Sequence, residues 1–262
     1  MIDYHVHSIH SGDSPARVRE MCLRAVEIGI SEICFTEHLD FTPTDISYGS
    51  FVYNDWIKDI ASAREEFSDR LTIRMGVEVD FQQKYIPQIE DFVSSREFDY
   101  VLASAHYVNG VLLENHKDYF PGKNTRDAYA PYFEVALGAA EAGIFDALAH
   151  LDLCKRYGVL YFGCFGSEDF QSEIEAVIRA VIKSNMALEI NTSGLRQAPG
   201  ETYPCQNIIN RYVELGGRLI TIGSDAHTPE QLGYGLIDAQ SILAQAGIAE
   251  PARFHKRKVI TE

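Results

Sequence analysis

Two hydrophobic patterns alternate along the chain. Short apolar runs rich in β-branched residues are typical of buried strands, and stretches with an apolar residue every three or four positions are typical of amphipathic helices. The first pattern predicts strands at residues 2–7, 32–36, 71–81, 100–106, 145–150, 187–191 and 218–222. The second pattern predicts helices at residues 14–29, 55–67, 87–95, 125–142, 168–184 and 207–215.

The alternation has no break that resembles a linker. Repeated strand–helix units predict an α/β fold with a parallel sheet, in a single domain over residues 1–262. With seven such units a closed, TIM-like (β/α)7 barrel is favoured over an open sheet. In such barrels the chemistry lies at the C-terminal ends of the strands.

Local signals mark several boundaries. Ser14-Pro15 is expected to open the first helix, and Gly29 to end it. Asn109-Gly110 predicts a type I′ turn in a hairpin over residues 107–113. Residues 39–54 are rich in Thr, Pro, Ser and Gly and predict a long loop, which is a candidate lid.

Composition narrows the class of protein. A formal net charge of −15 argues against nucleic acid as a partner, and no apolar run is long enough for a membrane span. The chain shows no leader, so we expect a cytoplasmic location. Five scattered cysteines do not form a disulfide pattern. No pattern indicates an oligomeric state.

Histidines and carboxylates gather where the predicted strands end. Side chains at i and i+2 of a strand share a face, so two alternate residues can bind one metal ion together. A barrel would bring all of these ends to one mouth. The residues concerned are His5, His7, His38, Glu78, His106, His150, Asp225 and His227.

Six short motifs occur in order over nearly the whole chain, and together they resemble the PHP (polymerase and histidinol phosphatase) superfamily. They are Asp3-x-His5-x-His7-Ser8, Thr36-Glu37-His38, Val77-Glu78-Val79, Ser104-Ala105-His106, Ala149-His150 and Ser224-Asp225-Ala226-His227. Residues 33–38, 105–110 and 189–196 resemble the histidinol-phosphate phosphatase branch. The resemblance implies a distorted seven-stranded barrel with three divalent metal ions.

The resemblance also implies how the ligands are shared. One metal would be held by His5, His7, Glu78 and Asp225, and a second by Glu78, His106 and His150. The third would be held by His38, His227 and Asp13, where some members of the family have a histidine instead of the aspartate. Mixed imidazole and carboxylate ligands favour zinc, iron or manganese. Asp3, Glu37 and Asp152 are candidates to orient the imidazoles.

Two arginines follow predicted strands at the same mouth. Arg156 and Arg196 are therefore candidates for a clamp on phosphate oxygens. Together with Glu78 and Asp225 they form the predicted catalytic set, while Lys155 is a weaker neighbour. Glu114 and Glu189 are candidate partners for an ammonium group.

The activity that the resemblance implies is hydrolysis of L-histidinol phosphate, with a metal-activated hydroxide as the nucleophile. An alternative is a PHP-type phosphoesterase acting on a nucleotide or another small phosphorylated metabolite. A polymerase-associated nuclease fits an acidic chain poorly. A purely structural metal module is disfavoured because such sites are usually closed.

Overall fold

Seven parallel strands form the centre of the computed structural model, which describes residues 1–260. Their order in the sheet is β1-β2-β3-β4-β7-β8-β9. Their bounds are β1 Ile2–Val6, β2 Glu32–Leu39, β3 Thr72–Asp80, β4 Tyr100–Ser104, β7 Ala147–Leu148, β8 Ala187–Asn191 and β9 Ile220–Gly223.

The first and last strands approach each other and nearly close the sheet. Val6 and Ala226 form a parallel bridge, and the amide of His7 donates to the carbonyl of Ala226 at 2.9 Å. The amide of Asp225 donates to the carbonyl of His5 at 2.8 Å. The predicted (β/α)7 barrel is confirmed, and the two ends of the sequence meet at its mouth.

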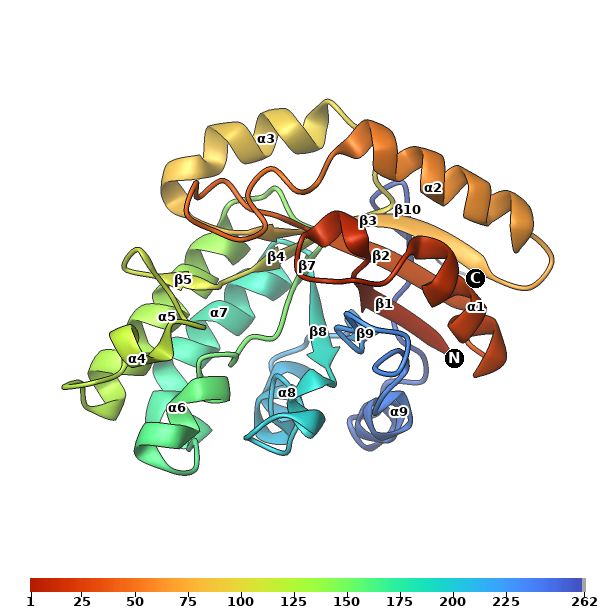
Figure 1. The fold of residues 1–262 in the computed structure, drawn as a ribbon. Helices are drawn as coiled ribbons and strands as arrows, with labels where there is room; N and C mark the ends of the chain where they lie inside the picture. Colours follow the sequence, from red (N-terminus) through yellow and green to blue (C-terminus); the bar gives the residue numbers. More distant parts are fainter. Residues whose placement is uncertain (261–262) are drawn as a thin grey trace.

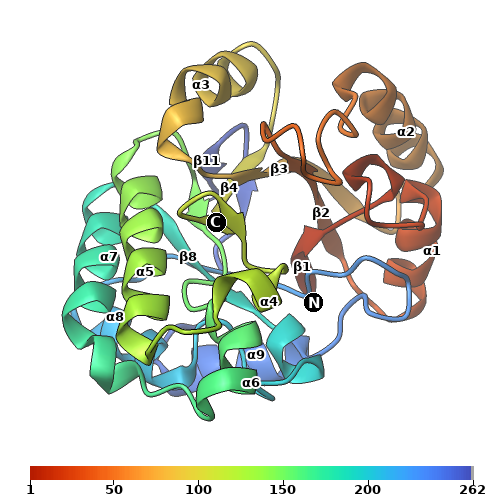
Figure 2. The ribbon, with the colours of Figure 1, turned by 60° about the vertical axis from the view of Figure 1, so that its left-hand side comes forward.

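Helices lie around the outside of the strands (Figures 1 and 2). They are α1 Val18–Glu27, α2 Tyr53–Glu66, α3 Ile86–Ser94, α4 His116–Tyr119, α5 Thr125–Glu141, α6 Lys155–Phe162, α7 Gln171–Lys183, α8 Gln206–Glu214 and α9 Leu236–Gln245. Short 3-10 turns are η1 Ile9–Ser11, η2 Gln83–Tyr85, η3 Ser167–Phe170 and η4 Ser193–Arg196.

Two small hairpins stand apart from the barrel strands. The first joins β5 Tyr107–Val108 to β6 Val111–Leu112, and the second joins β10 Phe254–His255 to β11 Lys258–Val259. Both turn residues of the first hairpin have positive φ, 53° at Asn109 and 78° at Gly110. This is the backbone of a type I′ turn, as predicted.

Two predicted elements were wrong in extent. The first helix begins at Val18 rather than at Ser14, because the Ser14 hydroxyl donates to the carbonyl of His227 at 2.7 Å and fastens its segment across the barrel mouth. The fifth predicted strand, residues 145–150, pairs only over Ala147–Leu148. It ends early because the backbone turns at His150, where φ is 25°.

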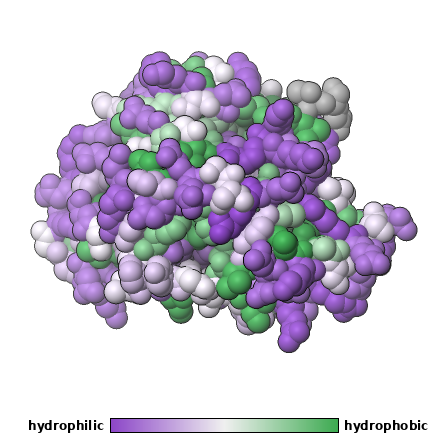
Figure 3. All heavy atoms as spheres, turned by 90° about the horizontal axis from the view of Figure 1, so that it is seen from above, coloured by the Kyte–Doolittle hydropathy of each residue, from purple (hydrophilic) through white to green (hydrophobic). Residues whose placement is uncertain are grey.

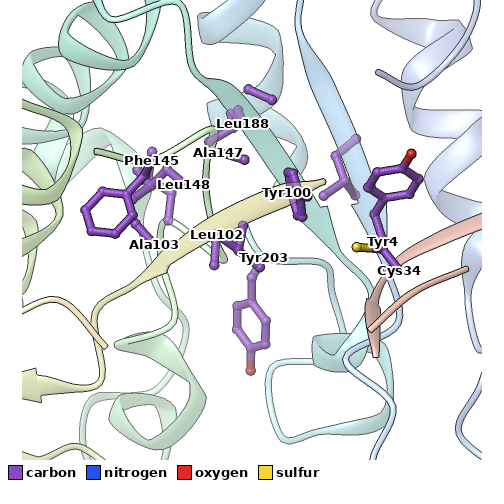
Figure 4. Packing of buried hydrophobic residues seen from close by; sticks show 14 of the residues in the cluster. Tyr4, Cys34, Tyr100, Leu102, Ala103, Phe145, Ala147, Leu148, Leu188 and Tyr203 are labelled. Carbon is purple, nitrogen blue, oxygen red and sulfur yellow. The ribbon is translucent and has the colours of Figure 1, made fainter. Parts of the chain in front are cut away.

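Buried hydrophobic side chains pack closely around the barrel strands (Figure 4). Tyr4 and Tyr100 meet edge to face, with ring centroids 5.5 Å apart. The Tyr4 hydroxyl donates to Glu32 at 2.5 Å, and the hydroxyls of Tyr100 and Thr221 lie 3.1 Å apart. These hydrogen-bonded aromatic residues fill the barrel below the level at which the strands end, so the polar groups of the predicted site gather at the C-terminal ends.

The outer surface is mostly hydrophilic on the face seen from above in the orientation of Figure 1, with only small hydrophobic areas (Figure 3). Within residues 1–260, none of the helices combines the length and the apolar character needed to cross a bilayer.

Candidate metal centre

Glu78 lies at the centre of the predicted ligands. It is near the end of β3 and is only 1 % exposed. Its two carboxylate oxygens lie between 2.9 and 3.5 Å from ring nitrogens of five histidines. These are His5, His7, His38, His106 and His150. One carboxylate is therefore shared by side chains from four other strands or the loops that follow them.

Four donor atoms around Glu78 have the spacing of a metal's first coordination sphere. His5 Nε2 and His7 Nε2 lie 3.2 and 3.5 Å from Glu78 Oε2. The same two nitrogens lie 3.8 and 3.5 Å from Asp225 Oδ1. Metal–donor bonds of about 2.0–2.1 Å at tetrahedral angles place donors roughly 3.3 Å apart.

These buried donors have no hydrogen bonds of their own. His5 Nε2, His7 Nε2 and Glu78 Oε2 are inaccessible to solvent and lack a hydrogen-bond partner among the described residues. Buried polar atoms are rarely left in this state without a ligand. The residues present therefore fit a divalent metal ion held by His5, His7, Glu78 and Asp225.

The hydrogen bond made by Nδ1 of His5 and of His7 fixes the tautomer of each imidazole. His5 Nδ1 lies 2.6 Å from a carboxylate oxygen of Glu189, which can only accept, so Nδ1 carries the proton. The Ser11 hydroxyl donates to Glu37 at 2.6 Å and accepts from His7 Nδ1 at 3.0 Å. Both Nε2 lone pairs are thereby left free for a metal.

A second group of donors surrounds Asp13. His227 Nε2 lies 2.9 Å from Asp13 Oδ2, and its Nδ1 donates to the carbonyl of Asp225 at 3.1 Å. His38 Nε2 lies 3.4 Å from Asp13 Oδ2, while its Nδ1 lies 2.9 Å from Glu78. His38 therefore lies between two of the metal positions that the family resemblance implies, and the division of ligands among three ions stays a prediction.

The electrostatic environment acts differently on the individual donors. Although burial lowers the pKa of His5 and His38, nearby carboxylates raise it well above its usual range: chiefly Glu189 for His5 and Glu78 for His38. Burial, reinforced by the nearby His227 and His38, lowers the pKa of His7 to about 3. Burial lowers the pKa of His106 to about 4. Although burial raises the pKa of Glu78, the surrounding histidines hold it well below its usual range. His7, His106 and Glu78 are therefore in the forms that metal binding requires, which are neutral imidazoles and an ionised carboxylate.

Two of the predicted ligands occupy strained backbone. His150 has φ 25° and Asp225 has φ 54°, a region that non-glycine residues rarely adopt. The Arg196 guanidinium donates to the carbonyls of Ser224 and Asp225, both at 2.7 Å. Arg196 thus holds the ligand-bearing turn in place, a role that the sequence did not indicate.

A pocket of about 260 Å³ opens above the cluster. Arg156 and Arg196 both line it, as does Glu114, so these three predicted residues face the space where a substrate would bind. Lys155 does not: it is fully buried and its ammonium contacts Asp152, Glu201 and the carbonyl of Thr202.

Two carboxylates, Asp40 and Asp45, line another side of the pocket, and a carboxylate oxygen of Asp80 lies within 4.8 Å of one of Asp40. Burial, with the negative charge of Asp45 and Glu78 nearby, raises the pKa of Asp80 to about 6. Burial and the neighbouring Asp80 raise the pKa of Asp40 well above its usual range. Acidic side chains are therefore concentrated near this side of the pocket, and they raise one another's pKa.

Some expected roles were wrong. Glu189 lies behind His5 and His150 and accepts from the His150 amide at 3.0 Å, so it is no ammonium partner. Asp3 accepts from the amide and hydroxyl of Ser224, at 2.8 and 2.6 Å, instead of from an imidazole. Asp152 contacts Lys155 and the amide of Cys205.

Ser11 is a positioning residue that the sequence reasoning missed, and Glu189 is one to which it gave the wrong role. Glu189 lies two residues before Asn191 on β8, and the side chains of both reach toward the ligands. The alternation of a strand could have indicated this shared face. No local signal distinguishes Ser11 from other serines of the loop.

A seven-stranded barrel with a histidine–carboxylate cluster at its mouth and two arginines beside it defines a metal-dependent hydrolase of the (β/α)-barrel class. The PHP domain model matches residues 3–193, more than half of the chain. The chain therefore belongs to the PHP domain family. Asp225 and His227 lie beyond the matched residues, and the closing of the barrel brings them to the site.

Relatives and solved structures agree with this assignment. The chain is 28% identical over 259 residues to the histidinol-phosphatase of Lactococcus lactis, covering 98% of this chain and 96% of that protein. It is 30% identical over 239 residues to a probable histidinol-phosphatase of Thermotoga maritima, covering 90% and 88%.

A crystal structure of the Lactococcus lactis histidinol phosphate phosphatase contains zinc, L-histidinol and phosphate. It matches with a TM-score of 0.92 at 27% identity and covers 99% of this chain and 98% of that chain. A putative histidinol phosphatase of Listeria monocytogenes matches with a TM-score of 0.75 at 20% identity, over 91% and 99% of the chains, which shows the shared fold alone.

Proposed function

We propose that this protein is a metal-dependent phosphomonoesterase that hydrolyses L-histidinol phosphate to L-histidinol and phosphate. The observation that carries the proposal is the buried donor set at metal-coordination spacing, within a fold that superposes over nearly its whole length on a phosphatase holding zinc, L-histidinol and phosphate. The activity rests on this site rather than on the fold, because one fold serves many reactions.

The metal-binding part of the proposal assigns His5, His7, Glu78 and Asp225 to one ion. His106 and His150 share Glu78 on its other oxygen, and Asp13, His38 and His227 form the remaining group. Bound divalent ions supply Lewis acidity toward the phosphoryl oxygens and lower the pKa of water. Zinc is the ion in the Lactococcus lactis structure, and the three-ion count is our proposal.

The residues of the chain then position the reacting groups. Arg156 and Arg196 line the same pocket as Glu78 and Asp225 and can bind phosphoryl oxygens that the metals leave free. Their fixed positive charge stabilises the phosphoryl group as negative charge develops in the transition state. No buried serine or cysteine nucleophile is required in this scheme, since water is the attacking group.

The test is a phosphate-release assay on zinc-loaded protein with a panel of esters. We expect kcat/KM for L-histidinol phosphate to exceed that for nucleotides and sugar phosphates by at least about 100-fold, because a built site discriminates strongly between transition states. Arg156→Ala should raise KM for every ester about 10-fold or more by removing a phosphate contact. Equal rates across the panel would contradict the substrate assignment.

A further inference from the structure

The acidic wall opposite the arginines supplies none of the side chains assigned above to a metal ion or to phosphate. It consists of Asp40 after the end of β2, Asp80 at the end of β3 and Asp45 in the loop between β2 and α2. Carboxylate oxygens of Asp40 and Asp80 and a ring nitrogen of His106 lie within 4.8 Å of one another.

Two of the three carboxylates are fully engaged by protein donors. Asp80 accepts from the Gln82 amide at 2.7 Å and from the backbone of His106 at 3.0 Å, one donor on each oxygen. Asp45 accepts from the amide of Ser47 and the hydroxyl of Tyr107, both at 2.8 Å, again one on each oxygen. These contacts fix the wall in place before any ligand arrives.

Asp40 differs from its neighbours. Its side chain lines the pocket and the residue is only 7% exposed, yet no hydrogen bond or ion pair to its carboxylate is found within residues 1–260. A carboxylate that is largely shielded from water is stabilised by a positively charged partner, and Asp40 faces the pocket from which such a partner could reach it. Among the described residues the Asp40 carboxylate therefore has no hydrogen bond or ion pair, although the charge of nearby His38 acts on it.

The order of strands places this wall across the mouth from the arginines. Asp40 and Asp80 follow β2 and β3, whereas Arg156 and Arg196 follow β7 and β8, three positions further around the seven-stranded sheet. The pocket is thus positive at one side and negative at the other, with the metal ligands between. A substrate with a phosphate at one end and a cation at the other matches this polarity.

We propose that Asp40, supported by Asp45 and Asp80, binds the positively charged group of the substrate and selects phosphate monoesters of amino alcohols over uncharged ones. This inference rests on the proposed function and assigns the residue that would recognise the ammonium or imidazolium of the substrate.

The surroundings of Asp40 favour an organic cation over a further metal ion. Both oxygens of Asp80 already accept from fixed protein donors, which leaves few free lone pairs for a metal. Ile46, Leu112 and Leu113 also line the pocket and offer an apolar surface for the carbon skeleton of a substrate. No lysine lines the pocket, and the two arginines that do line it follow β7 and β8, on the other side of the mouth from Asp40.

The experiment compares Asp40→Asn with the unaltered zinc-loaded protein on three esters. L-Histidinol phosphate and O-phosphoethanolamine carry a cation, and p-nitrophenyl phosphate does not. We expect the preference for L-histidinol phosphate over p-nitrophenyl phosphate, as a ratio of kcat/KM, to fall about 10- to 100-fold in the variant, mainly through KM. Asp238→Asn, an exposed aspartate on α9, is the matched control and should keep the ratio.

Each other outcome has a defined meaning. An equal loss on charged and uncharged esters, or the loss of a metal ion per chain by elemental analysis, would overturn the inference. If the unaltered protein prefers O-phosphoethanolamine to L-histidinol phosphate and Asp40→Asn removes that preference, the inference stands and the proposed substrate fails. If the unaltered protein prefers no cationic ester, both fail. Asp45→Asn should change the ratio in the same direction and replaces Asp40→Asn if that variant does not fold.

Discussion

Glu189 lies behind the predicted ligands rather than in the pocket, and it links two of them. One oxygen accepts from His5 Nδ1 at 2.6 Å and the other from the amide of His150 at 3.0 Å. The residue is 1% exposed, so water cannot replace either contact. A single carboxylate therefore fixes the tautomer of one ligand and the strained backbone of another.

We expect Glu189→Gln to weaken metal binding about 10- to 100-fold, because the variant loses the charge that raises the basicity of the His5 imidazole. Competition with a chromogenic chelator would measure the affinity. Glu134→Gln, an exposed change on α5, should leave the affinity unaltered. Full zinc affinity in Glu189→Gln would show that Glu189 does not position the ligand.

At the scale of elements, Asp99 joins the barrel to the hairpin β10–β11. It precedes β4 and is 5% exposed. Its carboxylate accepts from the amides of Met75 and Lys256, both at 3.0 Å, and contacts Arg64 and His255 at 3.1 and 2.8 Å. Although burial raises the pKa of Asp99, these donors and charges lower it overall.

The lowered pKa of Asp99 predicts how stability depends on pH. A carboxylate with a depressed folded-state pKa stabilises the protein above its unfolded-state pKa of about 3.9, and this contribution is lost as pH falls through the folded-state value. We therefore expect Asp99→Asn to destabilise the protein by about 1–3 kcal/mol at pH 7 and progressively less below about pH 4.

Urea unfolding of the variant and the unaltered protein at several pH values would measure the difference. Asp91→Asn, exposed on α3, is the control. A destabilisation by Asp99→Asn that is constant from pH 7 to pH 3 would exclude ionisation of Asp99 as its cause.

At the scale of the whole molecule, metal binding and folding are coupled. The proposed ligands come from residues as far apart in sequence as His5 and His227, and the apposition of β1 and β9 assembles them. A ligand that binds only the folded state stabilises it according to its concentration relative to Kd. The buried, unpartnered donors of the cluster mark where that stabilisation arises.

We expect removal of metal with a chelator to abolish phosphatase activity and lower Tm, and zinc at 100 times its Kd to raise Tm again by about 5–10 °C. His7→Ala should lose most of the zinc-dependent shift. His10→Ala should keep it, because His10 contacts Asp59 outside the cluster. A Tm that does not respond to zinc would contradict the coupling, and magnesium should have a smaller effect because it prefers oxygen ligands.

Periodicity in the sequence was enough to predict the barrel and the end of the barrel that carries the site. Strand positions follow from runs of buried apolar residues, and the ligands follow because histidines and carboxylates end those runs. The extent of the first helix was not predictable in this way, since Ser14 satisfies a distant carbonyl instead of capping its own helix.

The sequence by itself determined which histidines and carboxylates lie at the barrel mouth. They end the predicted strands, and the C-terminal ends of parallel strands lie together. Only the tertiary structure decided what each side chain contacts there. Glu189 orients His5, Arg196 holds the turn at Asp225, and Asp40 faces the pocket. These contacts join residues far apart in the chain, at distances set by how the strands pack, and no local pattern contains that information.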